Sequence, residues 1–239
     1  MMDISAIINL HGEGDMAASS LESLYRATDV AGKQGVSVEL IAALDRPDEA
    51  TLKAVRACAR PGLRILQLDK GDLGASRNAA VSTAAGEWVA FLDGDDLWDR
   101  QWLAEAFRAA SADPRDVIWH PEVNVYFGET PSLLVHMDME DEAFDLAALA
   151  AGNYWTALCF TRRRILERTP YPETDLNKRV GFEDWGWNIA AIAAGNLHKV
   201  VKGTGHAIRT RPGSLARTTA SHGARPDISG LFRYNIAKT

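Results

Sequence analysis

Three carboxylates stand within four positions, directly after an apolar run that is typical of a buried strand. The run Trp88-Val-Ala-Phe-Leu is followed by Asp93, Asp95 and Asp96, and the glycine among them permits a tight turn. So much negative charge at one strand end is unfavourable unless a cation neutralises it. Oxygen ligands select a hard divalent ion, so the cluster predicts a Mg²⁺ or Mn²⁺ site. The structural alternative is helix capping, with Asp96 as N-cap of a helix over residues 97–110, and it is compatible with metal binding.

Two further segments place polar side chains where a ligand would bind. The segment Gly71-Asp-Leu-Gly74-Ala-Ser-Arg77-Asn78 opens a helix after a strand. Backbone N–H groups and an arginine there suit a phosphate or a nucleobase edge, although an arginine on an exposed helix face gives the same pattern. Glu183 and Asp184 begin a predicted helix among aromatic residues. One carboxylate is a candidate general base, and the alternative is that both acids only stabilise the helix N-terminus.

A sheet must position these segments, because strand-like and helix-like patterns alternate along the first hundred residues. This alternation predicts βαβ units and a mostly parallel sheet. The strand-like runs are apolar along their whole length, which indicates strands buried on both faces, and ligands bind beyond the carboxyl ends of such strands. The expected strands are 4–10, 36–44, 63–68 and 88–92, and the expected helices are 16–31, 48–59 and 75–85. The polar residues at the strand ends are Asn9, His11, Asp45, the segment 69–77 and the cluster at 93–96.

The second half of the chain has a less regular pattern. The expected strands are 117–120, 123–127 and 198–201, the expected helices are 144–151, 162–168 and 184–194, and 169–180 is an expected loop. From Lys202 onward there are seven basic residues and a single acid, Asp227. This composition predicts either a solvated terminus or a flap over an anionic ligand such as a diphosphate, with His206, Arg209 and Arg211 nearest to it.

Composition excludes several classes of protein. Of the 239 residues, 46% are hydrophobic and 24% are charged, which excludes global disorder. The net charge of −6 argues against duplex DNA as a ligand, so we expect no nucleic-acid partner. Two cysteines without C-x-x-C spacing exclude a disulfide scaffold and a zinc ribbon. No signal-peptide pattern and no apolar run of about 18 residues is present, so we expect a cytoplasmic protein without a transmembrane segment.

The order of these motifs resembles that of the inverting glycosyltransferases of family 2, which have the GT-A fold. The resemblance covers about residues 3–215 and is most specific from Gly74 to Trp98. It implies an α/β protein with a mostly parallel central sheet flanked by helices. One GT-A domain would span 1–215, with a Rossmann-like nucleotide-sugar-binding half at 1–100 and an acceptor-binding half at 101–215. A basic tail would follow at 216–239.

The resemblance implies roles for individual residues on the donor side. Asp45 would accept a hydrogen bond from the base, commonly uracil, and Arg77 would lie near the base or the diphosphate. Asp93 and Asp95 match the family's D-x-D motif, with Asp93 toward the ribose and the metal and Asp95 on the metal. Gly74 belongs to the Gly74-Ala-Ser-Arg77-Asn78 motif, and it would also bind the donor.

Further roles follow in the same way. Asp184 matches the catalytic base and Glu183 is its neighbour, while Asp96 and His206 are additional candidate metal ligands. The chain departs from the family pattern after the first strand, where Asn9-Leu10-His11-Gly12 replaces the usual proline and aromatic residue. His11 would then stack on the base, and Asn9 is also expected to bind the donor. The residues expected to shape the acceptor site are Trp155, Trp185, Trp187 and the loop 169–180.

The implied activity is metal-dependent, inverting transfer of a sugar, of the hexosyltransferase type. The donor would be a nucleoside-diphosphate sugar, with UDP-sugar favoured, and the acceptor a hydroxyl of a carbohydrate or glycolipid in cell-envelope synthesis. A peripheral membrane contact and a homo-oligomer remain open. The alternatives are a nucleotide-sugar-binding module without turnover and a haloacid-dehalogenase-type phosphatase with Asp93 as nucleophile.

Overall fold

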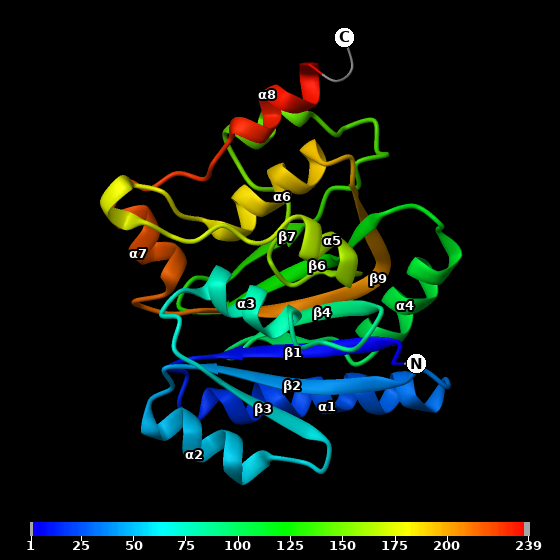
Figure 1. Cartoon of the computed structure of the whole chain (residues 1–239), viewed down its shortest axis with the longest axis vertical. Coiled ribbons are helices and arrows are strands. Elements are labelled where there is room, and N and C mark those ends of the chain that lie inside the picture. The colour runs from blue at the N-terminus through cyan, green and yellow to red at the C-terminus, as the bar shows by residue number, and fades with distance from the viewer. Residues whose placement is uncertain (1, 237–239) are drawn as a thin grey trace.

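A nine-stranded mixed sheet forms the centre of the molecule (Figure 1), in the computed structural model that describes residues 2–236. The strand order is β3-β2-β1-β4-β8-β6-β9-β5, and β7 pairs with β6. The strands are β1 (Ile4–Leu10), β2 (Val38–Asp45), β3 (Leu63–Leu68), β4 (Trp88–Asp93), β5 (Leu97–Trp98), β6 (Val117–Gly128), β7 (Ser132–Val135), β8 (Phe160–Arg162) and β9 (Leu197–Thr210). The helices are α1 (Met16–Lys33), α2 (Glu49–Cys58), α3 (Leu73–Val81), α4 (Trp102–Ala112), α5 (Arg163–Arg168), α6 (Glu183–Ala193), α7 (Leu215–Ser221) and α8 (Ser229–Ile236), with short 3₁₀ turns at Leu146–Ala150 and Leu176–Lys178.

The predicted parallel sheet is confirmed for β1 to β4. β1 pairs in parallel with β2 and with β4, so Asn9 lies opposite Asp93 at the carboxyl ends. Every residue of β1 is buried, because helices cover both faces of the sheet. β3 differs from the prediction: it is the edge strand and half of its residues are exposed. The carboxyl ends of β1, β2 and β4 therefore carry the polar residues singled out in the sequence.

The second half joins the same sheet through antiparallel and parallel pairings. β8 is antiparallel to both β4 and β6, and β6 is parallel to β9. β6 merges two predicted strands, with a register shift between Pro121 and Val123 where proline cannot donate a ladder hydrogen bond. β9 is 14 residues long, far longer than the predicted strand at 198–201, and it delivers Arg209 beside the acidic cluster.

Two segments fold differently from the expected pattern. The predicted helix over 97–110 is replaced by the short strand β5 and by α4, whose N-cap is Gln101 rather than Asp96. The basic tail is folded within the described residues: α8 packs on α6, with Leu231 in a cluster that includes Ile189. Figure 1 shows α6 and α8 together at the end of the molecule opposite α2.

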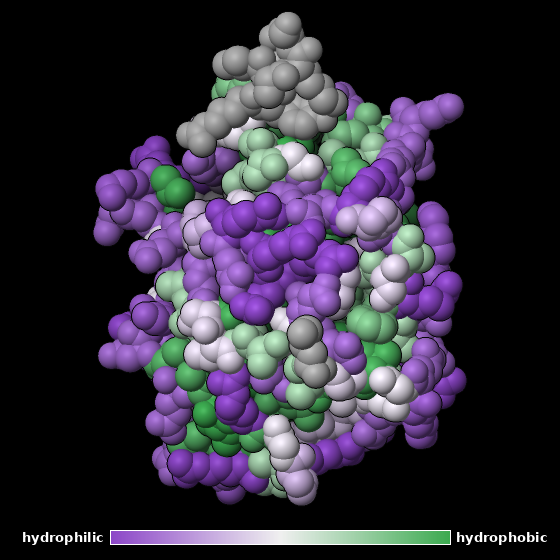
Figure 2. Space-filling model, turned by 45° about the vertical axis from the view of Figure 1, so that its right-hand side comes forward, coloured by the Kyte–Doolittle hydropathy of each residue, from purple (hydrophilic) through white to green (hydrophobic). Residues whose placement is uncertain are grey.

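Two apolar layers pack on opposite faces of β1. Ile4 and Ile8 belong to the layer formed with α1 and α4, and Ile7 belongs to the layer formed with α3, α5 and α6. Hydrophilic side chains cover much of the face shown in Figure 2, and hydrophobic ones form separate groups. Among the helices of residues 2–236, none is both long and apolar enough to cross a membrane.

Candidate active site

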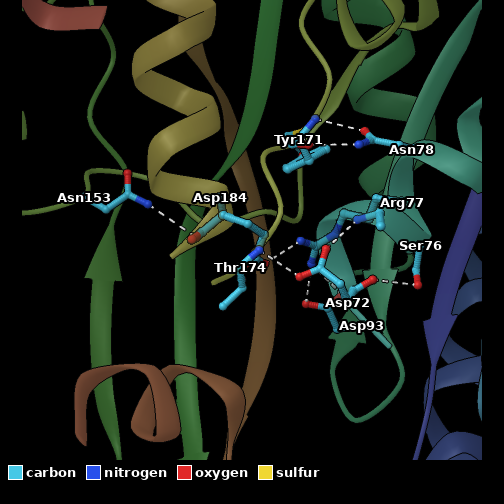
Figure 3. A network of polar contacts seen from close by, with 12 residues as sticks. Asp72, Ser76, Arg77, Asn78, Asp93, Asn153, Tyr171, Thr174 and Asp184 are labelled. Atoms are coloured by element: carbon cyan, nitrogen blue, oxygen red, sulfur yellow. Dashed lines mark hydrogen bonds and ion pairs between the residues drawn. The ribbon is translucent and has the colours of Figure 1, made fainter. Parts of the chain in front are cut away.

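A buried arginine connects the two halves of the site. Arg77, on α3, has a side chain that is 1% exposed. Its Nη1 donates to Glu183 Oε1 at 2.8 Å, and its Nη2 donates to Asp93 at 3.0 and 3.2 Å (Figure 3). Both terminal nitrogens are therefore engaged by carboxylates, and the expected role of Arg77 toward a base or diphosphate stays a prediction. Arg77 instead holds the end of β4 against the start of α6.

The three carboxylates after β4 have different surroundings. The turn is closed by a hydrogen bond from the Asp96 N–H to the Asp93 carbonyl at 3.1 Å. The Asp93 and Asp95 side chains are 29% and 16% exposed, and Asp95 Oδ2 accepts from Nε of Arg211 at 2.6 Å. Asp96 is 5% exposed and accepts from the Arg209 backbone N–H at 2.7 Å. Burial, together with the neighbouring carboxylates, raises the pKa of Asp96 well above its usual value.

These surroundings separate the metal candidates. Mg²⁺ is commonly bound by one or two carboxylates together with substrate phosphates. Asp93 and Asp95 fit that pattern, because both retain exposed carboxylate surface. Asp96 does not fit, because its side chain is buried and bonded to the backbone N–H of Arg209 on β9. Among residues 2–236 no three or more His, Cys, Asp or Glu side chains are grouped so that they alone could hold a metal ion.

His206 does not lie with the acidic cluster. Its ring is 2% exposed and meets the Trp102 ring edge-on at a centroid distance of 4.8 Å. Its Nδ1 is 2.8 Å from the Gly205 carbonyl, and its Nε2 has no hydrogen-bond partner among the described residues. Burial lowers the pKa of His206 to about 3. The pairing of His206 with Trp98 across β5 and β9 turns the ring into the core, so the structure does not support it as a metal ligand.

The carboxylate of Asp45, at the end of β2, accepts hydrogen bonds from the segment that follows β3. Its Oδ1 accepts from the Lys70 N–H at 2.6 Å, and its Oδ2 accepts from the Gly71 N–H and the Ser76 hydroxyl, each at 2.8 Å. These hydrogen bonds outweigh burial and lower the pKa of Asp45, so it is ionised at neutral pH. His11 lies nearby and is exposed, with Nδ1 2.6 Å from the Asp45 carbonyl. Asp45 thus shapes the loop, and its role toward a base stays a prediction.

Asn9 ends β1 beside Asp93 and is 4% exposed. Neither polar atom of its side chain has a hydrogen-bond partner among the described residues. A buried amide without a partner is unfavourable, which is compatible with a polar ligand at this strand end. The donor-binding role expected for Asn9 therefore remains a prediction.

Gly74 and Asn78 on α3 fix the loop that leads to Asp184. A Cβ at Gly74 would lie 2.4 Å from the Pro172 carbonyl oxygen, so only glycine permits this close approach. Asn78 exchanges two hydrogen bonds with the backbone of Tyr171, each at 2.9 Å (Figure 3). Gly74 therefore packs against the acceptor half, and its expected role in donor binding stays a prediction.

Asp184 lies in the first turn of α6, next to Glu183. The preceding residue, Phe182, has φ +56°, a left-handed conformation that is unfavourable for a non-glycine residue and is often found at functional sites. Asp184 is partly buried, and its Oδ2 accepts from Asn153 Nδ2 at 3.3 Å. Burial and the Glu183 charge raise the pKa of Asp184 to about 7, and Arg77 acts in the opposite direction. A carboxylate with that pKa is suited to proton transfer at neutral pH.

Aromatic residues near Asp184 belong mostly to the core. Trp155 and Trp187 are each 1% exposed, so neither presents the open stacking face expected for an acceptor. Trp187 stacks on Tyr171 at 4.7 Å, and Trp185 donates to the Leu149 carbonyl at 2.9 Å. Only Trp185 of the three tryptophans is partly exposed.

Two residues of the site were not predicted from the sequence. Asn153 follows the 3₁₀ turn at 146–150 and touches Asp184. Tyr126, on β6, lies close enough to Asp184 and Asp96 that their charges, after burial, raise its pKa to about 12. Neither residue belongs to a local motif, because long-range sheet pairing brings Tyr126 to the site and the loop after the 3₁₀ turn brings Asn153 there.

The sheet order, the carboxylates after β4 and the acid at the start of α6 define a GT-A glycosyltransferase fold. Solved structures with this fold agree. The structure of S. aureus TarS 1–349 in complex with UDP-GlcNAc matches with a TM-score of 0.67 and 18% identity, over 97% of this chain and 69% of that one. The mannosyltransferase PcManGT from Pyrobaculum calidifontis, in complex with GDP-Man and Mn²⁺, matches with a TM-score of 0.64 and 18% identity, over 90% of this chain and 59% of that one.

Sequence comparison gives the family. The sequence model of glycosyl transferase family 2 matches residues 5–169. The succinoglycan biosynthesis protein ExoO of Rhizobium meliloti (strain 1021) is 27% identical over 227 residues, which are 90% of this chain and 63% of that protein. The chain therefore spans somewhat less than two thirds of this relative. It belongs to glycosyl transferase family 2, and the match gives no support to the phosphatase alternative.

Proposed function

We propose that the protein is a metal-dependent, inverting glycosyltransferase that moves a sugar from a nucleoside-diphosphate sugar to an acceptor hydroxyl. The single observation that carries the proposal is the Arg77 bridge, which holds the carboxylate end of β4 beside the partly buried Asp184. A donor-side carboxylate and a proton acceptor are thus fixed together, as a displacement reaction requires.

Asp184 is the proposed general base. The acceptor oxygen attacks the anomeric carbon while its proton passes to the Asp184 carboxylate, and the bond from that carbon to the diphosphate oxygen breaks with its electron pair. One displacement inverts the configuration at the carbon. The pKa near 7 leaves a large fraction of Asp184 ionised at neutral pH and keeps it basic enough to accept the proton.

Asp93 and Asp95 are the proposed metal ligands. A bound Mg²⁺ or Mn²⁺ supplies positive charge that offsets the charge developing on the leaving diphosphate. Arg211 bonds to Asp95, and the Arg209 Nε lies 3.3 Å from the Asp95 carbonyl oxygen, so both arginines lie where an anionic donor would meet the cluster. We propose that Arg211 turns from Asp95 to the diphosphate when the donor binds.

We propose the donor and the acceptor from the proteins to which this chain is similar. TarS 1–349 was solved with UDP-GlcNAc and PcManGT with GDP-Man, so we propose a UDP-sugar and keep GDP-mannose as the alternative. The similarity to a succinoglycan biosynthesis protein supports a carbohydrate or glycolipid acceptor in cell-envelope polysaccharide synthesis. The cytoplasmic location stays a prediction.

The test is release of nucleoside diphosphate from UDP-glucose, UDP-N-acetylglucosamine and GDP-mannose with Mn²⁺. We expect slow release from at least one donor, with water as acceptor, and a loss of at least about a hundredfold in D184N. D29N is the matched control, because it removes one carboxylate from the exposed side of α1. Full activity of D184N would refute the base assignment. Binding of a donor without release from any would favour the non-catalytic module.

A further inference from the structure

The Asp184 carboxylate is held by a chain of two asparagine side chains. Asn153 Nδ2 donates to Asp184 Oδ2 at 3.3 Å, and Asn188 Nδ2 donates to Asn153 Oδ1 at 3.1 Å. In the view of Figure 3, Asn153 and Arg77 lie on opposite sides of Asp184. The carboxylate is therefore contacted by an amide on the side away from the arginine bridge.

The order of donors along this chain fixes the orientation of both amides. Asn188 lies four residues after Asp184 on α6, one turn along the same helix face, and its side chain is 0% exposed. Because Asn153 Oδ1 accepts from Asn188, the Asn153 amide nitrogen must face Asp184. The Trp155 backbone N–H donates to the same Oδ1 at 3.4 Å, which supports the same orientation.

The loop that carries Asn153 is anchored in the core. Trp155 donates from Nε1 to the Met137 carbonyl at 2.6 Å and stacks on the His198 ring at 4.1 Å. His198 in turn lies 2.9 Å from His120 through a ring–ring hydrogen bond. Asn153 thus lies in a loop, two residues before a side chain that is anchored in the core.

We propose that Asn153, oriented by Asn188, is a positioning residue for Asp184. Its amide holds Oδ2 and favours the ionised carboxylate, so that Oδ1 is left for the acceptor hydroxyl. The proposal rests on the proposed function, because that function supplies the acceptor hydroxyl from which Asp184 takes a proton. It goes further, because it assigns a role to two side chains outside the family motifs. Asn153 and Asn188 would set the pH at which Asp184 can accept a proton.

Other charged and titratable groups around Asp184 also influence its pKa. Glu183 on α6 and Asp93 at the end of β4 raise its pKa, and Arg77 on α3 lowers it. Tyr126 on β6 and Tyr171 in the loop before α6 also lie within its electrostatic range, and their own pKa values are raised, so both are neutral near pH 7. Replacing Asn153 leaves all five of these groups in place.

The experiment follows Asp184 directly, by NMR titration of protein labelled with ¹³C at the aspartate carboxyl carbons. The Asp184 resonance is the one that disappears in D184N. Loss of a hydrogen bond to the charged form raises a carboxyl pKa, so N153L should move the Asp184 midpoint upward by about one pH unit. N153Q, which keeps an amide donor, should give a smaller shift. N188L should also shift the midpoint upward, because the freed Asn153 amide loses its fixed orientation.

N196A is the matched control. Asn196 is 5% exposed and donates to the Ala191 carbonyl near the other end of α6, so its loss removes a buried hydrogen bond without touching Asp184. An unshifted midpoint in both N153L and N188L, or an equal shift in N196A, would overturn the inference. In donor release, the acid limb of kcat/KM should move with the NMR midpoint. The titration does not depend on turnover, so an active D184N would sink the base assignment separately.

Discussion

Replacing Arg77 by methionine should destabilise the protein strongly. The guanidinium is 1% exposed and contacts Glu183, whose side chain is 8% exposed, at 2.8 Å. Removing one partner of a buried ion pair leaves an uncompensated charge and costs about 3–5 kcal/mol. For a domain of this size that loss corresponds to a fall in Tm of roughly 6–20 °C. Urea unfolding at pH 8, followed by circular dichroism, measures the change in the free energy of unfolding.

R60M is the matched control for R77M. Arg60 also bonds to two carboxylates, Glu22 at 3.1 Å and Asp29 at 3.3 Å, but its side chain is 42% exposed. Exposed pairs contribute about 0–1 kcal/mol, so R60M should change stability only slightly. An R77M protein within about 1 kcal/mol of the wild type would refute the reasoning that this bridge holds the two halves together.

The R77M defect should also depend on pH. Arg77 lowers the pKa of Asp184, so its loss raises that pKa further above the unfolded value of 3.8. Between those two values the folded state binds more protons than the unfolded state, and stability falls as pH rises. The difference between R77M and the wild type should therefore be smaller at pH 5 than at pH 8. A difference that grows on acidification would contradict this sign.

Four other substitutions test separate parts of the structure. G74A should lower stability and donor affinity together because its Cβ meets the opposing backbone, whereas G32A on α1, where the added Cβ meets no atom within 4 Å, should stabilise by about 0.5–1 kcal/mol. Burial lowers the pKa of His198 to about 3, so the folded state binds fewer protons than the unfolded state below pH 6.5. Between pH 6.5 and 5 this histidine should cost about 2 kcal/mol of stability, and H198F should show a correspondingly shallower loss in urea titrations. R211Q should raise the donor Kd about tenfold in calorimetry, and an unchanged Kd would rule out the diphosphate contact.

Local patterns in the sequence were sufficient for the parallel half of the fold. Continuous apolar runs predicted β1, β2 and β4, and turn residues placed the acids at their carboxyl ends. The proximity of Asp93 to the Glu183-Asp184 pair followed from the family resemblance, and the structure adds that Arg77 makes the connection. No local signal shows that an arginine on a helix will be buried between two carboxylates 90 residues apart.

The remaining features depend on pairings between distant segments. β5 is two residues long, and its pairing with β9 decides that His206 faces Trp102 rather than the acidic cluster. The same strand brings the Arg209 N–H to Asp96, which explains why that residue is not a helix cap. Asn153 could not be predicted either, because the loop that carries it has no periodicity and its position depends on the burial of Trp155.

We propose that Asp93 and Asp95 hold a divalent cation against the diphosphate of a nucleotide sugar. Isothermal titration calorimetry of UDP-N-acetylglucosamine, UDP-glucose and GDP-mannose, with and without Mn²⁺, measures this coupling. We predict that the wild type binds at least one of them more tightly with Mn²⁺, and that D95N loses this gain while D29N keeps it. Binding by D95N that equals the wild type at every Mn²⁺ concentration would show that Asp95 is not a metal ligand.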